Sequence, residues 1–298
     1  MLCSRNFFLI LVFTPVLALG HTDISETIKA LTKRIETEPT ADLYYQRATE
    51  FRALQEKVHA IEDLESALKI EPHNRQALVA LIQLYETDKN AKILISKYQK
   101  FAKNKEEKFE AHYLLASYTA KLGLFEQASS QCDTLHLIRP NEDPALDLFH
   151  ADLLLKLQRP REAATILKKS LYHTKSIVVR NNWVDAALTA GQTKAVLPLI
   201  EKELSSSRFR SSWLIRRARA SLILKRKEAA QADLREALVE IAPRINTERP
   251  DFTLIADRGL IHALMGNKTW AKNDLEILKK SGYSPNAYRL LSSALAEQ

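Results

Sequence analysis

Glycine is scarce in this chain: it occurs 6 times in 298 residues, and no stretch is rich in it. This scarcity argues against a β architecture built on tight turns and against glycine-rich loops that hold phosphate groups. The sequence also lacks the H-E-x-x-H, G-x-S-x-G, Walker-type and C-x-x-C patterns, which mark several classes of enzyme and metal site. We therefore expect a protein that is not an enzyme, with no metal site and no cofactor.

Cysteine is almost absent as well, with Cys3 and Cys132 the only two. The mostly apolar run 7–19, followed by small residues, predicts a signal peptide over 1–20 that is cleaved after Gly20. The alternative is an uncleaved membrane anchor, although a membrane-spanning helix needs about 20 residues. Cleavage leaves Cys132 alone, so we expect no internal disulfide and a small buried residue at that position. We expect an exported protein, periplasmic or secreted, with no membrane span after cleavage.

Two phrases in the chain are nearly the same: AIEDLESALKIEP at 60–72 and AAQADLREALVEIAP at 229–243. Ala60 and Ala230 are 170 residues apart, which is five steps of 34. Hydrophobic residues recur at matching offsets in the intermediate steps. A period of 34 residues that holds over six repeats predicts a solenoid of stacked units.

Each repeat has the pattern of two amphipathic helices, because apolar residues recur three or four positions apart in both of its halves. Small residues such as Ala48 and Ala60 occur where the two helices of one repeat must approach closely. Gly123 and Gly191 fall in the turn between the helices, where a helix C-terminus favours a left-handed residue. Pro72 follows a second helix, where proline ends a helix cleanly.

This pattern resembles the tetratricopeptide repeat (TPR), whose signature is W-x2-L-G-x2-Y, then A-x3-F, then P at a spacing of 34 residues. The resemblance implies an all-α fold: a right-handed α-solenoid of about seven helix-turn-helix repeats over 21–298, with capping helices at both ends. A surplus of seven residues before the last repeat predicts an extended helix or a longer loop over 239–251. The repeats are expected near 41–74, 75–108, 109–142, 143–176, 177–210, 211–245 and 252–285, with a half-repeat at 25–36 and a terminal helix at 286–297.

Three repeats depart from the TPR pattern in a correlated way. They carry Arg at the seventh position, where Leu is usual, and Asp sixteen residues later, whereas the other four repeats have neither residue at these positions. This predicts an ion pair inside the repeat, in which the guanidinium of the first helix binds the carboxylate of the second and fixes their register. The alternative is coincidence on two solvated faces. The predicted structural ion pairs are Arg47 with Asp63, Arg217 with Asp233, and Arg258 with Asp274.

Basic residues exceed acidic ones, 44 against 36, for a formal net charge of +8. This moderate excess permits acidic partners, but it makes nucleic acid a poor partner. Eight basic residues and no acidic one occur between Arg208 and Lys227. This basic run is either a site for an anion or a set of charges that are paired or solvated separately. We favour the second interpretation, because Arg217 already has an expected partner in Asp233.

In TPR proteins the first helices of the repeats line an inner groove that usually binds an extended peptide or a partner helix, and the resemblance implies the same groove here. Positions 2, 5, 9, 12 and 13 of each repeat are expected to face it. The alternative is a solvated groove that binds nothing tightly. The expected partner-binding residues are Tyr45, Thr49, Arg52, Gln83, Glu86, Tyr113, Ser117, Lys121, Asp152, Asn181, Asp185, Ile215 and Arg219.

The leading hypothesis is therefore a non-catalytic scaffold that binds a peptide or protein partner in the concave groove of a TPR solenoid. The alternative is an accessory or regulatory subunit of an envelope or secreted enzyme system. Some TPR proteins hold a C-terminal carboxylate with Lys and Asn at positions 5 and 9 of one repeat. Tyr45 and Thr49 do not supply these residues, so this mode is not expected. The terminal helix at 286–297 is apolar enough to allow end-to-end self-association.

Overall fold

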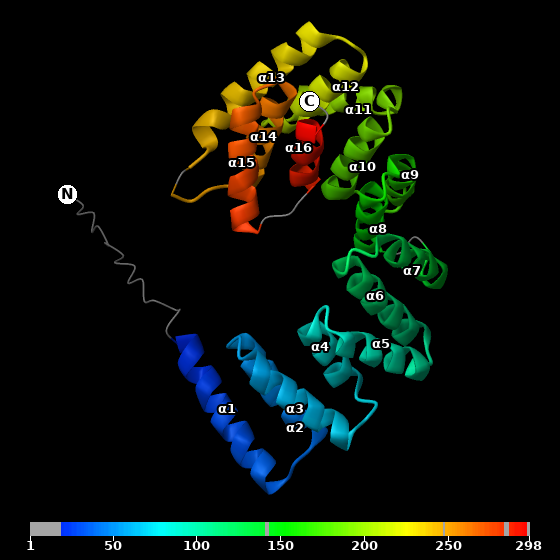
Figure 1. Cartoon of the computed structure of the whole chain (residues 1–298), viewed down its shortest axis with the longest axis vertical. Helices are drawn as coiled ribbons and strands as arrows, with labels where there is room; N and C mark the ends of the chain where they lie inside the picture. The colour runs from blue at the N-terminus through cyan, green and yellow to red at the C-terminus, as the bar shows by residue number, and fades with distance from the viewer. Residues whose placement is uncertain (1–18, 141–142, 247, 283–285, 297–298) are drawn as a thin grey trace, which may run out of the picture. The chain divides into compact units, whose positions relative to one another are not determined.

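The computed structural model describes residues 19–140, 143–246, 248–282 and 286–296, and within these ranges all regular structure is helical (Figure 1). Apart from its last two residues, the predicted signal peptide lies outside the described residues. None of the described helices combines the length and the hydropathy that a membrane crossing requires. The chain divides into two compact units, an N-terminal unit that ends at Ile138 and a C-terminal unit that begins at Arg139.

The described residues of the N-terminal unit form three helix pairs and a leading helix. Each pair packs internally, each packs on the next pair along the chain, and the leading helix packs on the first pair. The pairs coincide with the repeats expected near 41–74, 75–108 and 109–142, although the third begins four residues early, at Lys105. The helices are α1 (Leu19–Thr37), α2 (Ala41–Ala53), α3 (Lys57–Ile70), α4 (Arg75–Tyr85), α5 (Lys89–Phe101), α6 (Lys105–Lys121) and α7 (Phe125–Ile138).

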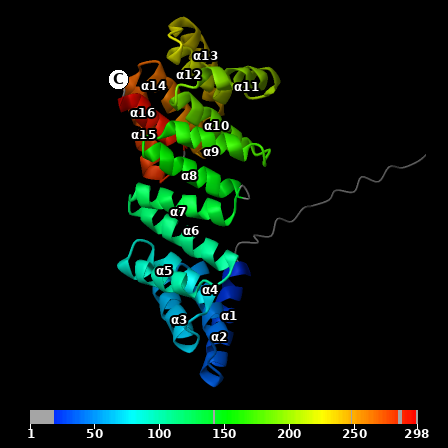
Figure 2. The same ribbon diagram turned by 90° about the vertical axis from the view of Figure 1, so that its right-hand side faces the viewer.

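The C-terminal unit contains four helix pairs and a closing helix, which Figure 2 shows from a second direction. Over 239–251, α13 extends to Ile241 and a short 3-10 helix and a loop follow, so the surplus residues form both of the structures expected there. The all-α fold of stacked helix pairs is confirmed. The helices are α8 (Pro144–Lys156), α9 (Pro160–Ser170), α10 (Ile177–Thr189), α11 (Thr193–Ser206), α12 (Ser211–Ile223), α13 (Lys227–Ile241), η1 (Ala242–Arg244), α14 (Phe252–Leu264), α15 (Lys268–Ser281) and α16 (Asn286–Ala296).

The turn between the two helices of a pair has one conformation that recurs along the described chain. Gly123 and Gly191 have φ of +76° and +73°, as the sequence predicts. Gln158 and Lys225 adopt the same left-handed conformation with φ of 59° and 58°, although they carry a side chain. In each case the backbone N–H groups of the turn bond to carbonyls three and five residues back, which satisfies the end of the first helix.

Small residues allow the paired helices to approach each other. In three of the repeats that have alanine at the facing positions of the two helices, all six side chains are fully buried. Close packing of this kind contributes stability through many small dispersion contacts, and a larger side chain at these positions would force the axes apart. The six alanines are Ala48 and Ala60, Ala116 and Ala128, and Ala218 and Ala230.

Candidate partner-binding site

The three predicted arginine–aspartate pairs form in the structure. In each one, Nε and Nη2 of the arginine donate to the two carboxylate oxygens of an aspartate on the second helix of the same repeat. The three carboxylates are buried, so the forked geometry compensates for their lost hydration and fixes how the two helices face each other. The distances are 2.8 and 2.7 Å for Arg47–Asp63, 2.9 and 2.7 Å for Arg217–Asp233, and 3.0 and 2.6 Å for Arg258–Asp274.

Two of these arginines also reach the helix that precedes their repeat. Arg47 Nη1 donates to Thr32 Oγ1 on α1 at 2.9 Å. Arg217 Nη1 donates to Glu201 Oε2 on α11 at 3.1 Å. In these two repeats the guanidinium therefore links the second helix of its own repeat to the helix that precedes the repeat. These two pairs thus act between neighbouring elements of the stack as well as within one repeat.

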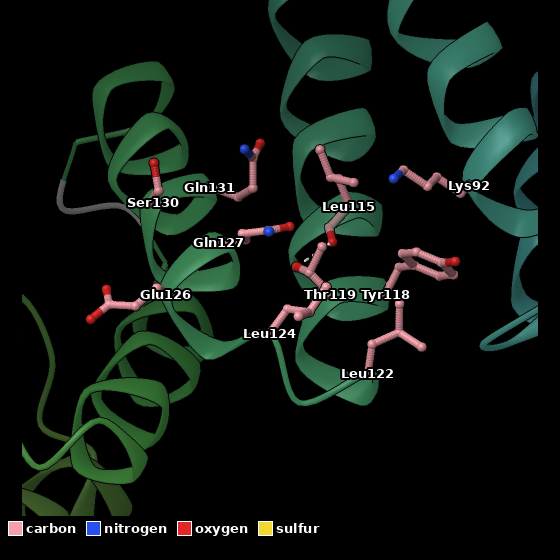
Figure 3. Close-up of a pocket in the computed structure, with 10 residues that line it drawn as sticks. All are labelled: Lys92, Leu115, Tyr118, Thr119, Leu122, Leu124, Glu126, Gln127, Ser130 and Gln131. Atoms are coloured by element: carbon pink, nitrogen blue, oxygen red, sulfur yellow. Dashed lines mark hydrogen bonds between the residues drawn. The ribbon is translucent and has the colours of Figure 1, made fainter. Parts of the chain in front are cut away.

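The repeat formed by α6 and α7 lacks this ion pair. Leu115 and Gln131 stand at the positions where other repeats have Arg and Asp, and His112 Nδ1 lies 2.8 Å from Gln131 Oε1. A cavity of about 500 Å³ lies there, with Lys92 of α5 at its far side (Figure 3). The absence of Arg and Asp at these two positions could have indicated this cavity from the sequence, but we did not predict it. The lining residues are Lys92, Leu115, Tyr118, Thr119, Leu122, Leu124, Glu126, Gln127, Ser130 and Gln131.

The first helices of the C-terminal unit form its inner layer. Helices α8, α10, α12 and α14 contact one another in order, more closely than α9, α11, α13 and α15 do. In a curved stack the more closely spaced layer lies on the inside of the curve. The concave face of this unit is therefore made by the first helices, as the TPR resemblance implies.

Asp185 of α10 is the centre of a charged cluster on this concave face. Its side chain receives 2.8 Å and 2.5 Å hydrogen bonds from Arg216 Nη2 and Arg219 Nη1 of α12. Burial of the carboxyl group favours a higher pKa, but the charges and hydrogen bonds of Arg216 and Arg219 outweigh it and lower the pKa of Asp185. The structure thus brings together two predicted groove residues, Asp185 and Arg219. They bind each other and not an open groove.

Asp257 of α14 borders the same cluster. Burial raises the pKa of Asp257 to about 6; the positive charge of Arg216 opposes this shift, and the negative charge of Asp185 adds to it. Arg216 is also held by an aromatic ring, since its guanidinium lies 5.0 Å from the centre of the Trp213 ring. The concave face therefore carries an acid with a pKa of about 6. The sequence pattern did not single out Asp257.

The predicted groove is only partly accessible in the C-terminal unit. Asp185 and Ile215 are 4% and 3% exposed, so neither side chain is available to a partner in this conformation. The reason is that α12 lies between α10 and α14 in the inner layer, and their side chains cover the positions that we expected to face a groove. Asp152 and Asn181 are half-buried, and Asp152 pairs with Lys156 of its own helix at 2.8 Å.

The closing helix α16 covers part of this concave face. It packs on α14 and α15, and its Leu291 is fully buried. A Cβ atom at Gly259 would lie 2.7 Å from Leu291 Cδ2, so glycine at that position makes room for the leucine. Arg289 lies within electrostatic reach of Asp152 on α8 and Asp185 on α10. A segment of the chain itself therefore occupies a surface that the sequence assigned to a partner.

The first helices of the N-terminal unit expose the residues that we predicted for them. Tyr113 of α6 is 40% exposed and stacks on Phe109, with 6.4 Å between the ring centres. Arg52 Nη2 of α2 donates to Gln83 Oε1 of α4 at 3.4 Å, which brings two predicted groove residues together. The remaining predicted residues of this unit are also exposed or half-buried. Tyr45, Thr49, Ser117 and Lys121 lie on α2 and α6, and Glu86 directly follows α4.

The basic run between Arg208 and Lys227 is divided among several places. Arg216 and Arg219 bind Asp185 on the concave face, whereas Arg217 binds Asp233 and Glu201 on the other side of α12. Arg210 Nη1 donates to Glu236 of α13 at 2.7 Å. Four of the eight basic side chains thus pair with acidic residues of the chain, at separate places, which supports the interpretation of separately paired charges. Within the described residues, no three His, Cys, Asp or Glu side chains are grouped so that they could hold a metal ion.

Comparison with known proteins agrees with the repeat pattern. The family model of the tetratricopeptide repeat matches residues 41–74, the segment that contains α2, α3 and the Arg47–Asp63 pair. Residues 41–74 are thus a tetratricopeptide repeat. A tetratricopeptide repeat protein from Parabacteroides merdae ATCC 43184 has a similar structure, with a TM-score of 0.58, 19% identity, and coverage of 86% of this chain and 97% of that chain. At this identity the likeness shows the fold alone.

Two further solved structures are less similar to this chain. YrrB, described as a TPR protein with an unusual peptide-binding site, gives a TM-score of 0.38 at 14% identity, over 71% of this chain and 92% of its own. PilW, described as a type IV pilus biogenesis factor, gives a TM-score of 0.36 at 15% identity, over 84% of this chain and 96% of its own. The comparison with curated proteins found no match.

Proposed function

We propose that this protein is a non-catalytic scaffold that binds a peptide or protein partner on the first helices of its N-terminal unit. The observation that carries the proposal is the exposed set of predicted groove residues on α2, α4 and α6, which combines tyrosine rings with amide, hydroxyl and charged groups. Such groups hydrogen-bond to a peptide backbone and pack on its side chains. The TPR fold, which supports a role in protein interaction, agrees with this assignment.

The proposed site is confined to the N-terminal unit because the two units present their first helices differently. In the C-terminal unit, α16 and internal ion pairs already occupy the predicted residues. In the N-terminal unit the described contacts between predicted residues are few and long, such as the 3.4 Å bond between Arg52 and Gln83. A partner can therefore replace these contacts at little cost, since exposed hydrogen bonds contribute little net stability.

We also propose that the protein acts outside the cytoplasm, on the basis of the apolar run 7–19 and the small residues after it. Fractionation of cells that produce the full-length chain tests this: recovery of a shortened chain from the exported fraction supports it. Recovery of the intact chain from the cytoplasm contradicts it.

The binding proposal is tested by capture from an envelope fraction, followed by affinity measurement on the captured partner. Tyr113→Ala is expected to weaken binding at least tenfold, since Tyr113 is an exposed aromatic side chain of the proposed site. Tyr172→Ala is the matched control, because Tyr172 is 77% exposed but lies in the C-terminal unit. Equal affinities of the two variants would refute the site. A captured enzyme whose activity changes on binding would favour the role of an accessory subunit.

A further inference from the structure

Two of the repeats with an arginine–aspartate pair also contain two packed rings. One ring stands four residues after the arginine, on the first helix, and the other stands twelve residues after it, on the second helix. The rings therefore fill space between the two helices of one repeat. The ring pairs are Phe51 with His59, whose centres are 5.0 Å apart, and His262 with Trp270, at 5.8 Å.

The α6–α7 repeat has no ring and no ion pair at these positions. Thr119 and Gln127 stand where the rings are, Leu115 and Gln131 stand where the ion pair is, and all four residues line the cavity in Figure 3. Each of the other six repeats has the ion pair or at least one ring at the four positions. In the three repeats without the ion pair, the rings are Tyr85, His150 and Trp183. The cavity thus lies where this repeat alone lacks both groups.

The walls of the cavity are largely apolar and partly exposed. Leu122 and Leu124 line it and are 42% and 43% exposed, and the buried Tyr118 lies beside them. Large apolar side chains exposed around a cavity are typical of a binding site. Sites for small molecules enclose about 300 to 1,000 Å³, so a cavity of about 500 Å³ can hold an aromatic ring with a short side chain.

The polar groups of the lining favour a negatively charged ligand. Lys92 is exposed, and it forms no ion pair with any residue that the structure describes. On α7, Gln131 Oε1 lies 2.8 Å from His112 Nδ1, which leaves the amide NH2 group of Gln131 as a donor. The acidic residue of the lining, Glu126, lies in the first turn of α7, where a helix N-terminus favours an acid. An ammonium group and an amide donor together suit a carboxylate.

We propose that the cavity of the α6–α7 repeat binds an aromatic carboxylate, whose ring takes the place of the ring that this repeat lacks. The ring packs on the leucines of the lining, and the carboxylate is bound by Lys92 and Gln131. None of the lining residues belongs to the predicted groove, so this is a second site, and the inference goes beyond the proposed scaffold function. The same chemistry occurs in free aromatic acids and at the end of a peptide whose last residue is aromatic.

The test is isothermal titration calorimetry on the full chain with indole-3-propionate and with indole-3-propanol, which has the same ring but no charge. We expect the acid to bind and the alcohol to bind about threefold to fivefold more weakly, as the loss of an exposed ion pair predicts. N-acetyl-alanyl-tryptophan is measured in parallel. If it binds more tightly than indole-3-propionate, the ligand is the end of a peptide, and if it binds more weakly, the ligand is a free acid.

Two variants test the two parts of the site. Lys92→Gln should weaken binding of the acid about threefold to fivefold and leave binding of the alcohol unchanged. Lys100→Gln is the matched control, because Lys100 is exposed on the same helix but does not line the cavity. Gln127→Trp places a ring where Trp270 stands in the α14–α15 repeat, so it should fill the cavity and weaken binding of both molecules about tenfold or more. Circular dichroism at 222 nm should be unchanged.

The proposal is overturned if neither the acid nor the dipeptide binds, or if the alcohol binds as tightly as the acid. It is also overturned if Gln127→Trp binds the acid as the unaltered chain does, or if Lys100→Gln weakens binding as much as Lys92→Gln. Tyr113→Ala should bind the acid normally, since Tyr113 does not line the cavity. The cavity and the proposed partner site therefore fail separately.

Discussion

The Arg258–Asp274 pair offers the sharpest test of how the repeats are held together. Asp274 is 2% exposed and receives two hydrogen bonds from Arg258, at 3.0 and 2.6 Å. Arg258→Leu restores the residue that is usual at this position of the TPR pattern, but it removes both donors. The carboxylate is then left in an apolar interface without its charged partner.

The size of the effect follows from burial. Removing one member of a buried ion pair costs about 3 to 5 kcal/mol. The Arg258 side chain is 27% exposed, so water can approach the site, and we expect a loss of about 3 kcal/mol for Arg258→Leu. The double variant Arg258→Leu with Asp274→Leu removes the stranded charge as well. Because burying an ion pair costs nearly as much as its attraction returns, the double variant is expected to lie within about 1 kcal/mol of the unaltered protein.

The assay is urea unfolding followed by circular dichroism at 222 nm, for the unaltered chain, both single variants and the double variant. The expected result is a coupling free energy of about 2 to 3 kcal/mol between the two positions. Trp270 on α15 is 62% exposed, and its fluorescence reports the same repeat. The reasoning is refuted if Arg258→Leu alone changes the free energy of unfolding by less than about 0.5 kcal/mol, or if the double variant is as unstable as Arg258→Leu.

Two further predictions concern single positions. Asp257 has a pKa of about 6 in the folded chain, above its unfolded value of about 3.9, so it stabilises the fold in acid and this contribution is lost as the pH rises from about 4 to about 6. Asp257→Asn should therefore raise the free energy of unfolding by about 1 to 2 kcal/mol at pH 8 and have little effect at pH 4, and the same gain at both values would contradict this. Gln158→Gly should raise the midpoint of thermal unfolding, because a left-handed residue with a side chain costs about 1 kcal/mol and Gln158 has φ of 59°. Lys168→Gly in the helical, exposed part of α9 is the control and should lower the midpoint.

The repeat architecture could be predicted from the sequence because it depends on features that recur. The helix pairs follow from apolar spacing, and the turn glycines Gly123 and Gly191 fall where the 34-residue period puts them. The Arg–Asp pairs could be found because both residues are present or absent together within a repeat. Each of these contacts lies inside one repeat, where the distance along the sequence is fixed.

The parts of the candidate site that the sequence did not predict depend on contacts that form in only one place along the chain. Asp185 meets Arg216 and Arg219 of the next repeat, and no other repeat has Arg at the positions of these two arginines. The fit of Leu291 at Gly259 depends on where α16 docks, which a periodic pattern does not specify. For the same reason Ile215 was assigned to the groove, although it is buried. The period gives a position within a repeat, but the exposure of that position depends on the neighbouring repeats.

The most direct test of the central claim is hydrogen–deuterium exchange on the full chain with and without a captured partner. We predict that the partner slows amide exchange in α2, α4 and α6 and leaves exchange in α3, α5 and α7 nearly unchanged, because the first helices carry the exposed contact residues. Protection confined to α3, α5 and α7, or to the residues around the cavity in Figure 3, would contradict the account.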